Sequence, residues 1–221
     1  MKKALVLGAS GGIGTAVFAE LVNRSYEVKG LSRSVDGLDV TDEASIERVL
    51  GALDGTYDLI FVATGALTPS GHAPEKAIKD VSEDALIAQF KVNAIGPMLV
   101  LKHVTRLLPK DRKAVFATLS ARVGSIGDNR LGGWHGYRAS KAALNQFIHG
   151  ASIELKRTHK QAIAVCLHPG TVATSFTEKY ASRHSTSAPA LAAAQLIDVL
   201  ESATSDQTGG FYDFAGLEIP W

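Results

Sequence analysis

Tyr137 and Lys141 are four residues apart in a stretch whose pattern predicts a helix. Positions i and i+4 share one face of a helix, so the lysine ammonium can lie beside the tyrosine phenol. A free tyrosine has a pKa of about 10, too high for efficient base catalysis at neutral pH, and a neighbouring positive charge favours the tyrosinate. The pair therefore predicts proton transfer, with Tyr137 as the acid–base group and Lys141 lowering its pKa.

A glycine-rich segment near the start of the chain predicts the binding of a dinucleotide pyrophosphate. Residues 8–14 read Gly-Ala-Ser-Gly-Gly-Ile-Gly and stand between an apolar run and a helical pattern. Glycines allow a tight turn and a close approach of the backbone to phosphate, and the N-terminus of the following helix attracts anions. The alternative is a purely structural turn, which the tyrosine–lysine pair downstream disfavours. The candidate cofactor-binding residues here are Gly8, Ser10, Gly11, Gly12, Ile13 and Gly14.

The elements that must position these residues alternate along the chain. Apolar runs that predict about seven strands cover residues 4–7, 28–31, 38–40, 59–63, 114–119, 163–167 and 211–214. Helical patterns cover residues 15–24, 43–53, 84–108, with a break or bend at Gly96-Pro97, and 137–158. This alternation predicts an α/β fold, a doubly wound parallel sheet with helices on both faces. We expect one domain over residues 1–221.

Three loop-like stretches are candidate walls of a substrate site. They cover residues 68–76, 124–135 and 176–189 and are rich in small, polar and turn-forming residues. Ligands of an open α/β sheet bind beyond the carboxyl ends of the strands, where the first two stretches begin. Trp134, Phe176 and Tyr180 could contribute apolar contacts there.

The composition favours small molecules and protein subunits as partners. There are 23 basic and 22 acidic residues, for a net charge of +1, so an electrostatic basis for binding nucleic acid or an anionic membrane is missing. No apolar stretch approaches the roughly 20 residues of a membrane span, and the N-terminus does not read as a signal peptide. The single cysteine, Cys166, lies in an apolar run, which fits the reducing cytoplasm. Histidines lack a second ligand at metal-site spacing, and we expect no metal.

The order of the motifs resembles that of the short-chain dehydrogenase/reductase family. The glycine turn and the Tyr-x-x-x-Lys motif are joined by Asp39-Val40, Asn93-Ala-Ile-Gly96 and Pro169-Gly-Thr-Val-Ala-Thr174 in the family's order. The resemblance covers essentially the whole chain, and the segments that begin at Ser120 and Gly216 look most like the C-factor group of compact members. It implies a single-domain Rossmann fold, a nicotinamide cofactor and a homodimer or homotetramer.

The resemblance also implies roles for individual residues. Tyr137 would protonate a carbonyl oxygen during reduction, or remove the hydroxyl proton during oxidation. Lys141 would lower the pKa of Tyr137 and bind the nicotinamide ribose, and Asn93 would hold a water that links the lysine to bulk solvent. Further cofactor contacts are implied for Asp39, Val40, Ala63, Gly65, Pro169, Gly170, Val172 and Thr174.

Ser32 and Arg33 follow the second predicted strand and favour NADP(H) over NAD(H). A fold that prefers NAD often has Asp or Glu at this place, where the carboxylate binds the ribose hydroxyls and repels a 2′-phosphate. Here a hydroxyl and a guanidinium replace the acid, and the guanidinium fork suits a phosphate, with Ser10 as a further contact. Two alternatives stay open: Arg33 is a solvated surface residue, or Asp36 serves as the missing acid.

One catalytic position departs from the family pattern. Ala121 stands where the family has the second serine of a Ser-Ser-x-x-Gly stretch, whose hydroxyl orients the substrate carbonyl. Ser120 or Ser125 could supply the hydroxyl from a shifted position. Alternatively, turnover is slow with Tyr137 alone, since loss of one oxyanion donor costs about 2.7 to 4 kcal/mol, or the reaction has been lost and cofactor binding persists.

Two functions follow. The leading hypothesis is an NADP(H)-dependent reductase of a ketone or aldehyde, or the reverse alcohol oxidation. The alternative is a catalytically weak or inactive NADP(H)-binding signalling or sensor protein of the C-factor type. Retention of Tyr137, Lys141 and Asn93 favours the enzyme, because a pure binder has little physical need for the tyrosine.

Overall fold

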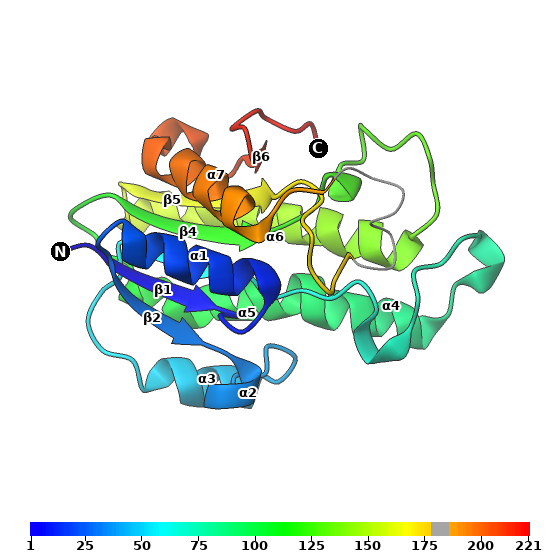
Figure 1. The fold of residues 1–221 in the computed structure, drawn as a ribbon, viewed down its shortest axis with the longest axis horizontal. Helices are drawn as coiled ribbons and strands as arrows, with labels where there is room; N and C mark the ends of the chain where they lie inside the picture. Colours follow the sequence, from blue (N-terminus) through cyan, green and yellow to red (C-terminus); the bar gives the residue numbers. More distant parts are fainter. Residues whose placement is uncertain (178–185) are drawn as a thin grey trace.

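Six parallel strands form the sheet of the computed structural model, which describes residues 1–177 and 186–221 (Figure 1). The strands are β1 (Lys3–Leu7), β2 (Glu27–Leu31), β3 (Leu59–Val62), β4 (Ala114–Leu119), β5 (Ala162–His168) and β6 (Phe211–Asp213). Their order is β2-β1-β3-β4-β5-β6, so the chain turns outward from β1 on one side and returns on the other. Ligands of doubly wound sheets bind at such a reversal point, and the glycine turn follows β1 there.

Helices cover both faces of this sheet, as the sequence predicted (Figure 1). The helices α1 (Gly12–Asn23) and α7 (Pro189–Ser202) pack on one face against β-strand residues such as Val6 and Phe61. The helices α3 (Glu43–Gly51), α5 (Gly96–Val104) and α6 (His135–Thr158) pack on the other face, against residues such as Leu5 and Ile60. The alternation of side chains along each strand thus builds two apolar cores, one on each face.

The apolar run 38–40 is not a strand, and the prediction of a strand there was wrong. Ser32 caps the short helix α2 (Arg33–Asp36), and Gly37 follows with a φ of 67°. The side chains of Leu38 and Val40 are nevertheless buried in the core. These residues are apolar because they pack beneath the sheet edge, and a run of three cannot distinguish this from a strand.

The predicted long helix between β3 and β4 changes geometry close to the expected bend. It begins as α4 (Glu83–Phe90), passes through a π-helical turn over Lys91–Ile95 and continues as α5. Pro97 lacks an N–H and cannot continue α-helical bonding to residue 93, while the Gly96 N–H bonds to the carbonyl of Lys91, five residues back. Residues Glu83–Leu107 have the length and mean hydropathy of a membrane span, but their apolar face packs in the core of this fold, against α3 and α6.

In residues 1–177 and 186–221 the remaining elements are short. They are 3₁₀ turns at Pro69–Gly71, Ile78–Asp80, Thr105–Leu107, Arg122–Gly124 and Ser205–Gln207.

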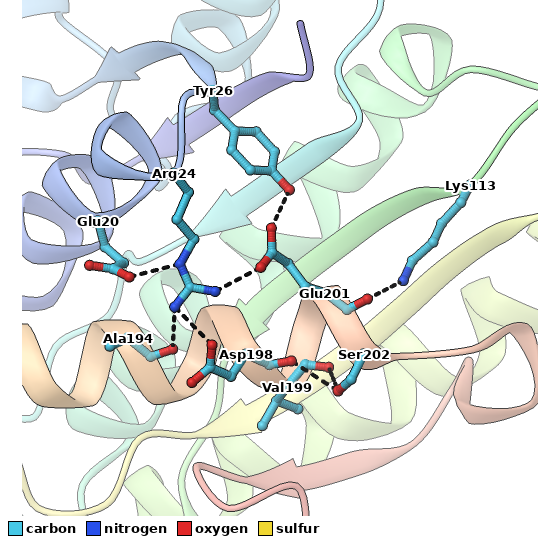
Figure 2. Close-up of polar contacts among 9 residues, drawn as sticks. All are labelled: Glu20, Arg24, Tyr26, Lys113, Ala194, Asp198, Val199, Glu201 and Ser202. Atoms are coloured by element: carbon cyan, nitrogen blue, oxygen red, sulfur yellow. Dashed lines mark hydrogen bonds and ion pairs between the residues drawn. The ribbon is translucent and has the colours of Figure 1, made fainter.

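A polar network ties α1 to α7 at the amino-terminal edge of the sheet (Figure 2). The Arg24 guanidinium pairs with Glu20, Asp198 and Glu201 at 2.7 to 2.8 Å. Tyr26 also donates to Glu201, at 3.0 Å. These residues precede strands or end helices, so the network stabilises the edge opposite the one where ligands of such sheets bind.

Candidate active site

The glycine turn after β1 has no room for side chains at its key positions. Gly8 has a φ of 82°, a region that L-residues other than glycine rarely adopt. A Cβ atom at residue 14 would lie 2.1 Å from the Gly8 carbonyl oxygen, and one at residue 12 would lie 2.5 Å from the Thr174 methyl carbon. The backbone N–H groups of Gly8 and Ala9 both bond to the Leu31 carbonyl, which fastens the turn to β2.

The turn fits a pyrophosphate. The helix α1 starts without a side-chain cap, so the first N–H groups of the helix are open to a ligand. Ser10, Gly11 and Gly12 are exposed, and Ile13 is half-buried. The glycines of this turn therefore allow both its backbone conformation and the close approach of phosphate oxygens to the backbone.

The later predicted cofactor segments converge on this turn. Ala63 follows β3, donates its N–H to Leu7 at 2.8 Å and lies against Gly8 and Gly14. Thr174 lies against Gly12, which brings the segment after β5 to the start of α1. In that segment Pro169 is half-buried, Gly170 has a φ of 76° and Val172 is buried.

The segment after β2 exposes the positively charged Arg33 side chain, while the nearby Asp36 carboxylate is hydrogen-bonded within the protein. Asp36 accepts the Ser32 N–H at 2.7 Å and lies 3.4 Å from the Ser32 hydroxyl. The Ser32 side chain is buried and also accepts the Val35 N–H, at 3.3 Å. Arg33 is exposed. The structure thus leaves the Arg33 guanidinium, rather than the Ser32 hydroxyl, as the accessible group for a phosphate.

Asp39 and Val40 lie next to this end of β2. The Thr41 N–H and hydroxyl donate to the Asp39 carboxylate at 2.9 and 2.7 Å. These bonds, together with the charge of Arg33, lower the pKa of Asp39. Val40 is buried, and a Cβ at residue 96 would lie 2.6 Å from its carbonyl oxygen, so Gly96 lets the helix approach this segment.

Tyr137 and Lys141 share one buried face of α6. Their exposed fractions are 5% and 3%, and the lysine Nζ lies 5.8 Å from the centre of the phenol ring. The Lys141 ammonium donates to the Leu119 carbonyl at 2.9 Å, at the carboxyl end of β4. A Cβ at residue 124 would lie 2.8 Å from the Lys141 Cβ, so Gly124 allows α6 to dock on the turn after β4.

Burial dominates the protonation of this pair. It raises the pKa of Tyr137 above its ordinary value of 10 and lowers that of Lys141 from 10.5 to about 8. The expected lowering of the tyrosine pKa by Lys141 is therefore not the ruling effect in this structure, because desolvation disfavours both charged forms. The phenol is protonated at neutral pH, which is the form that can donate a proton.

Asn93 fastens the loop after β3 to the π-helical turn that follows α4. Its amide nitrogen donates to the Ala66 carbonyl at 2.8 Å and to Gln89 Oε1 at 2.7 Å, and its oxygen accepts the Ala66 N–H at 3.0 Å. A Cβ at residue 65 would lie 3.2 Å from the Asn93 oxygen and 3.5 Å from the Lys141 Nζ. Gly65, Asn93 and Lys141, three of the residues predicted for the cofactor site, are thus brought together.

The two candidate serines donate their hydroxyl protons within the protein. Ser120 donates to Asn145 Oδ1 at 2.7 Å. Ser125 donates to the Pro220 carbonyl at 2.5 Å and accepts the Asp128 N–H at 3.0 Å. In this structure neither proton is free to orient a substrate carbonyl, and Ser125 instead fastens the C-terminal segment to the loop after β4.

Two aromatic rings flank the Tyr137 phenol. The ring centres of Trp134 and Phe176 lie 6.2 and 6.3 Å from that of Tyr137. These rings surround the phenol with apolar surface, consistent with the predicted substrate wall. Tyr180, also predicted there, lies outside the described residues.

Three buried polar residues near the site were not predicted from the sequence. Gln89 bonds to Asn93, Asn145 accepts from Ser120, and Glu75 contacts the first turn of α6. The position of Gln89 four residues before Asn93 was a usable signal, because i and i+4 share a helix face. Glu75 carried no such signal, since its partner Gly136 is 61 residues away.

Comparisons with known proteins agree with this arrangement. The family model described as short chain dehydrogenase matches residues 2–185. A 1-hydroxy-2-glutathionyl-2-methyl-3-butene dehydrogenase of Rhodococcus sp. strain AD45 is 31% identical over an alignment of 241 residues that covers 100% of both chains. The C-signal protein of Myxococcus xanthus is 31% identical over 146 residues, 66% of this chain and 84% of that protein.

A solved structure supports the same assignment. A putative short-chain dehydrogenase/reductase of Burkholderia multivorans with bound NADP has a TM-score of 0.83 and 25% identity, covering 100% of this chain and 99% of that one. The chain therefore belongs to the short-chain dehydrogenase/reductase family and is an NAD(P)-dependent oxidoreductase.

Proposed function

We propose that this protein is an NADP(H)-dependent reductase of ketones or aldehydes, or catalyses the reverse oxidation of an alcohol. The observation that carries the proposal is the buried Tyr137 phenol, 5% exposed and protonated at neutral pH, with the Lys141 Nζ 5.8 Å from its ring. A protonated phenol in a dry site can give its proton to a carbonyl oxygen as negative charge develops there.

The residues that would hold the cofactor form one continuous set. The turn from Gly8 to Gly14 and the N-terminus of α1 would bind the pyrophosphate, and Asp39 and Val40 would contact the adenine. Ala63, Gly65 and the segment 169–174 would border the nicotinamide half. When bound there, the nicotinamide supplies or accepts the hydride.

The protein's own groups then act on the substrate oxygen. Tyr137 donates the proton in reduction and takes it back in oxidation. Lys141 offers its ammonium to the nicotinamide ribose and, when protonated, stabilises the tyrosinate left behind. Asn93 holds the Ala66 backbone beside this lysine and would border a water path to bulk solvent. Because burial lowers the pKa of Lys141 to about 8, proton exchange by this lysine is accessible near neutral pH.

Arg33 supports the preference for NADP(H). Arg33 is exposed just after β2, while the Asp36 carboxylate accepts the Ser32 N–H at 2.7 Å. The similar Burkholderia structure contains NADP. We expect Arg33→Ala to raise the KM for NADPH at least about tenfold more than that for NADH, because a charge-assisted contact to the 2′-phosphate is lost. Lys29→Ala, which removes an exposed cation of β2, is the matched control. Equal effects on both cofactors would overturn the preference.

The second candidate function is an NADP(H)-binding sensor with little or no turnover. It is favoured by Ala121 together with the internal hydrogen bonds of Ser120 and Ser125, and by the similarity to the C-signal protein. Ala121→Ser separates the two possibilities. A large gain in turnover would show that the native site lacks the hydroxyl, and no gain in an active wild type would show that the site works without one.

The experiment that tests the proposal is a titration with NADPH and NADH followed by a substrate screen. Nicotinamide fluorescence gives the two Kd values, and apolar ketones and aldehydes are then assayed with the cofactor that binds. An alcohol bearing a glutathionyl group belongs in the panel because the Rhodococcus relative is named for such a compound. Selective NADPH binding with turnover supports the reductase, and selective binding without turnover supports the sensor.

We also expect a homodimer or homotetramer and a cytoplasmic location. The helices α4 and α6 expose the apolar residues Ile87, Phe147 and Ile153, which suit a helix-to-helix interface. Light scattering after size-exclusion chromatography measures the assembly. A monomer across the micromolar range would contradict that expectation.

A further inference from the structure

Glu75 is a buried acid that the proposed chemistry does not use. It lies in the loop between β3 and α4 with 5% of its surface exposed. Its two carboxylate oxygens are 3.3 and 3.2 Å from the Gly136 nitrogen, and its backbone carbonyl accepts the Trp134 N–H at 2.6 Å. We propose that Glu75 is a positioning residue, which caps α6 and thereby fixes the phenol of Tyr137.

The start of α6 needs such a cap. Its N-cap residue, Trp134, has a φ of 51° and makes no side-chain cap, and the first turn of the helix contains no acidic residue. The first N–H groups of a helix have no partner within the helix, and the positive end of the helix dipole attracts an anion. Glu75 meets both needs from a distant loop. The contact also stabilises the buried Glu75 carboxylate, because burying a charge without hydrogen bonds is costly.

The contact is shaped around glycine. A Cβ at residue 136 would lie 2.9 Å from Glu75 Oε1, 3.2 Å from Gln89 Cγ and 3.3 Å from Leu86 Cδ2. The absence of a side chain at Gly136 is therefore what lets the carboxylate and α4 close on the helix start. This close packing makes a side chain of the length of glutamate the fitting partner for the Gly136 N–H.

The same contact extends to the rest of the site. Gln89 donates to the Leu67 carbonyl at 2.9 Å and accepts from Asn93 at 2.7 Å. The loop from residue 65 to residue 75 is thus held at one end by Gln89 and Asn93 and at the other by Glu75. This arrangement joins a candidate substrate wall directly to the residue that precedes Tyr137.

Loss of the cap should act on catalysis more than on cofactor binding. Gly136 is adjacent to Tyr137 and is held by the Glu75 carboxylate, so loss of this side chain releases the helix turn that carries the phenol. The Trp134 N–H bonds to the Glu75 backbone carbonyl, and this contact remains when the side chain is removed. A displacement of about 1 Å can cost about 100-fold in rate. The glycine turn joins β1 to α1 and, within the described residues, makes no hydrogen bond with Glu75.

The test compares Glu75→Ala and Glu75→Gln with Glu83→Ala, the removal of an exposed carboxylate from the first turn of α4. Turnover is expressed per bound NADPH, counted by fluorescence titration, because a merely structural role would change the amount of competent protein and leave this quantity unchanged. We expect a loss of about 10- to 100-fold for Glu75→Ala, with the NADPH Kd within about twofold. The glutamine variant keeps an acceptor oxygen and should stay within about threefold, and the control should equal wild type.

Turnover per bound NADPH within twofold of wild type in Glu75→Ala would overturn the proposal. Should that variant not fold, Glu75→Asp decides: its carboxylate is one methylene too short for Gly136, so wild-type turnover would equally overturn the proposal. The catalytic part rests on the proposed function. If wild type itself has no turnover, the proposed function fails. The role of Glu75 as a helix cap is then tested by amide hydrogen exchange of residues 134–140. Faster exchange in Glu75→Ala than in Glu83→Ala supports the cap, and equal exchange overturns it.

Discussion

Lys141 is expected to destabilise the protein when no cofactor is bound. Its side chain is 3% exposed, and the ammonium donates to the Leu119 carbonyl at 2.9 Å. Burial lowers its pKa from 10.5 to about 8. Because one pKa unit corresponds to about 1.36 kcal/mol, the protonated lysine lowers the free energy of unfolding by about 3 kcal/mol at pH 7.

Lys141→Met tests this value directly. Methionine keeps most of the apolar volume and removes the charge, while the Leu119 carbonyl loses a donor at about 1 kcal/mol. The variant should therefore be about 2 kcal/mol more stable than wild type at pH 7 and should melt about 4 to 8 °C higher. Replacement of a buried charge by an apolar side chain of similar size is often stabilising.

The pH dependence separates this mechanism from a simple packing effect. Between pH 8 and 10.5 the unfolded chain keeps residue 141 protonated while the folded chain does not, so the unfolded state binds more protons. Wild-type stability then rises with pH relative to the variant, whose advantage should shrink by about 1.4 kcal/mol per pH unit. Burial also raises the pKa of Tyr137 and of Cys166, with the opposite slope, but both groups are present in the two proteins.

Denaturant unfolding at pH 7, 8, 9 and 10 measures the difference. Lys156→Met, in the exposed last turn of the same helix, is the matched control and should change stability by less than about 0.5 kcal/mol. A Lys141→Met protein that is less stable than wild type at pH 7, or an advantage that does not vary with pH, would refute the reasoning.

Two further predictions concern the glycine turn and the network of Figure 2. Gly14→Ala would place a Cβ 2.1 Å from the Gly8 carbonyl oxygen, so NADPH affinity should fall at least about tenfold and Tm should drop. The control is Gly51→Ala, where no atom lies within 4 Å of the added carbon, and it should leave NADPH affinity unchanged. Equal NADPH affinities in the two variants would contradict this prediction. Arg24→Ala should lower Tm by about 2 to 8 °C, since an arginine with three carboxylate partners contributes about 1 to 2 kcal/mol. NADPH affinity should not change, and a Tm equal to that of Arg157→Ala, an exposed arginine on α6, would show that the network contributes nothing.

The sequence sufficed where local pattern and burial agree. The run 114–119 was predicted as a strand, and β4 has those bounds, because a strand buried on both faces is continuously apolar. The run 38–40 also buries apolar side chains, but its backbone does not pair with a strand. The apolar pattern alone could not show this difference. The turn at residues 8–14 could be predicted because a Cβ atom at residue 12 or 14 would clash with its neighbours, which requires glycine there.

The parts of the site that could not be predicted depend on contacts between distant segments. Ser120 and Ser125 both looked available for catalysis, and only the fold shows that Asn145 and Pro220 accept their protons. The expected effect of Lys141 on the Tyr137 pKa followed from spacing, whereas the ruling effect is burial, which spacing does not report. Glu75 is similar, because its partner lies across 61 residues.

The proton donation by Tyr137 is tested most directly by single-turnover oxidation of bound NADPH. Wild type and Tyr137→Phe are saturated with NADPH and mixed with the best carbonyl substrate of the panel, and the loss of nicotinamide absorbance is followed by stopped flow. The variant should bind NADPH within about twofold of wild type and react at least about 100-fold more slowly, because general acid catalysis contributes about 10² to 10⁴. Equal rates in the two proteins would contradict the role of Tyr137 as the proton donor.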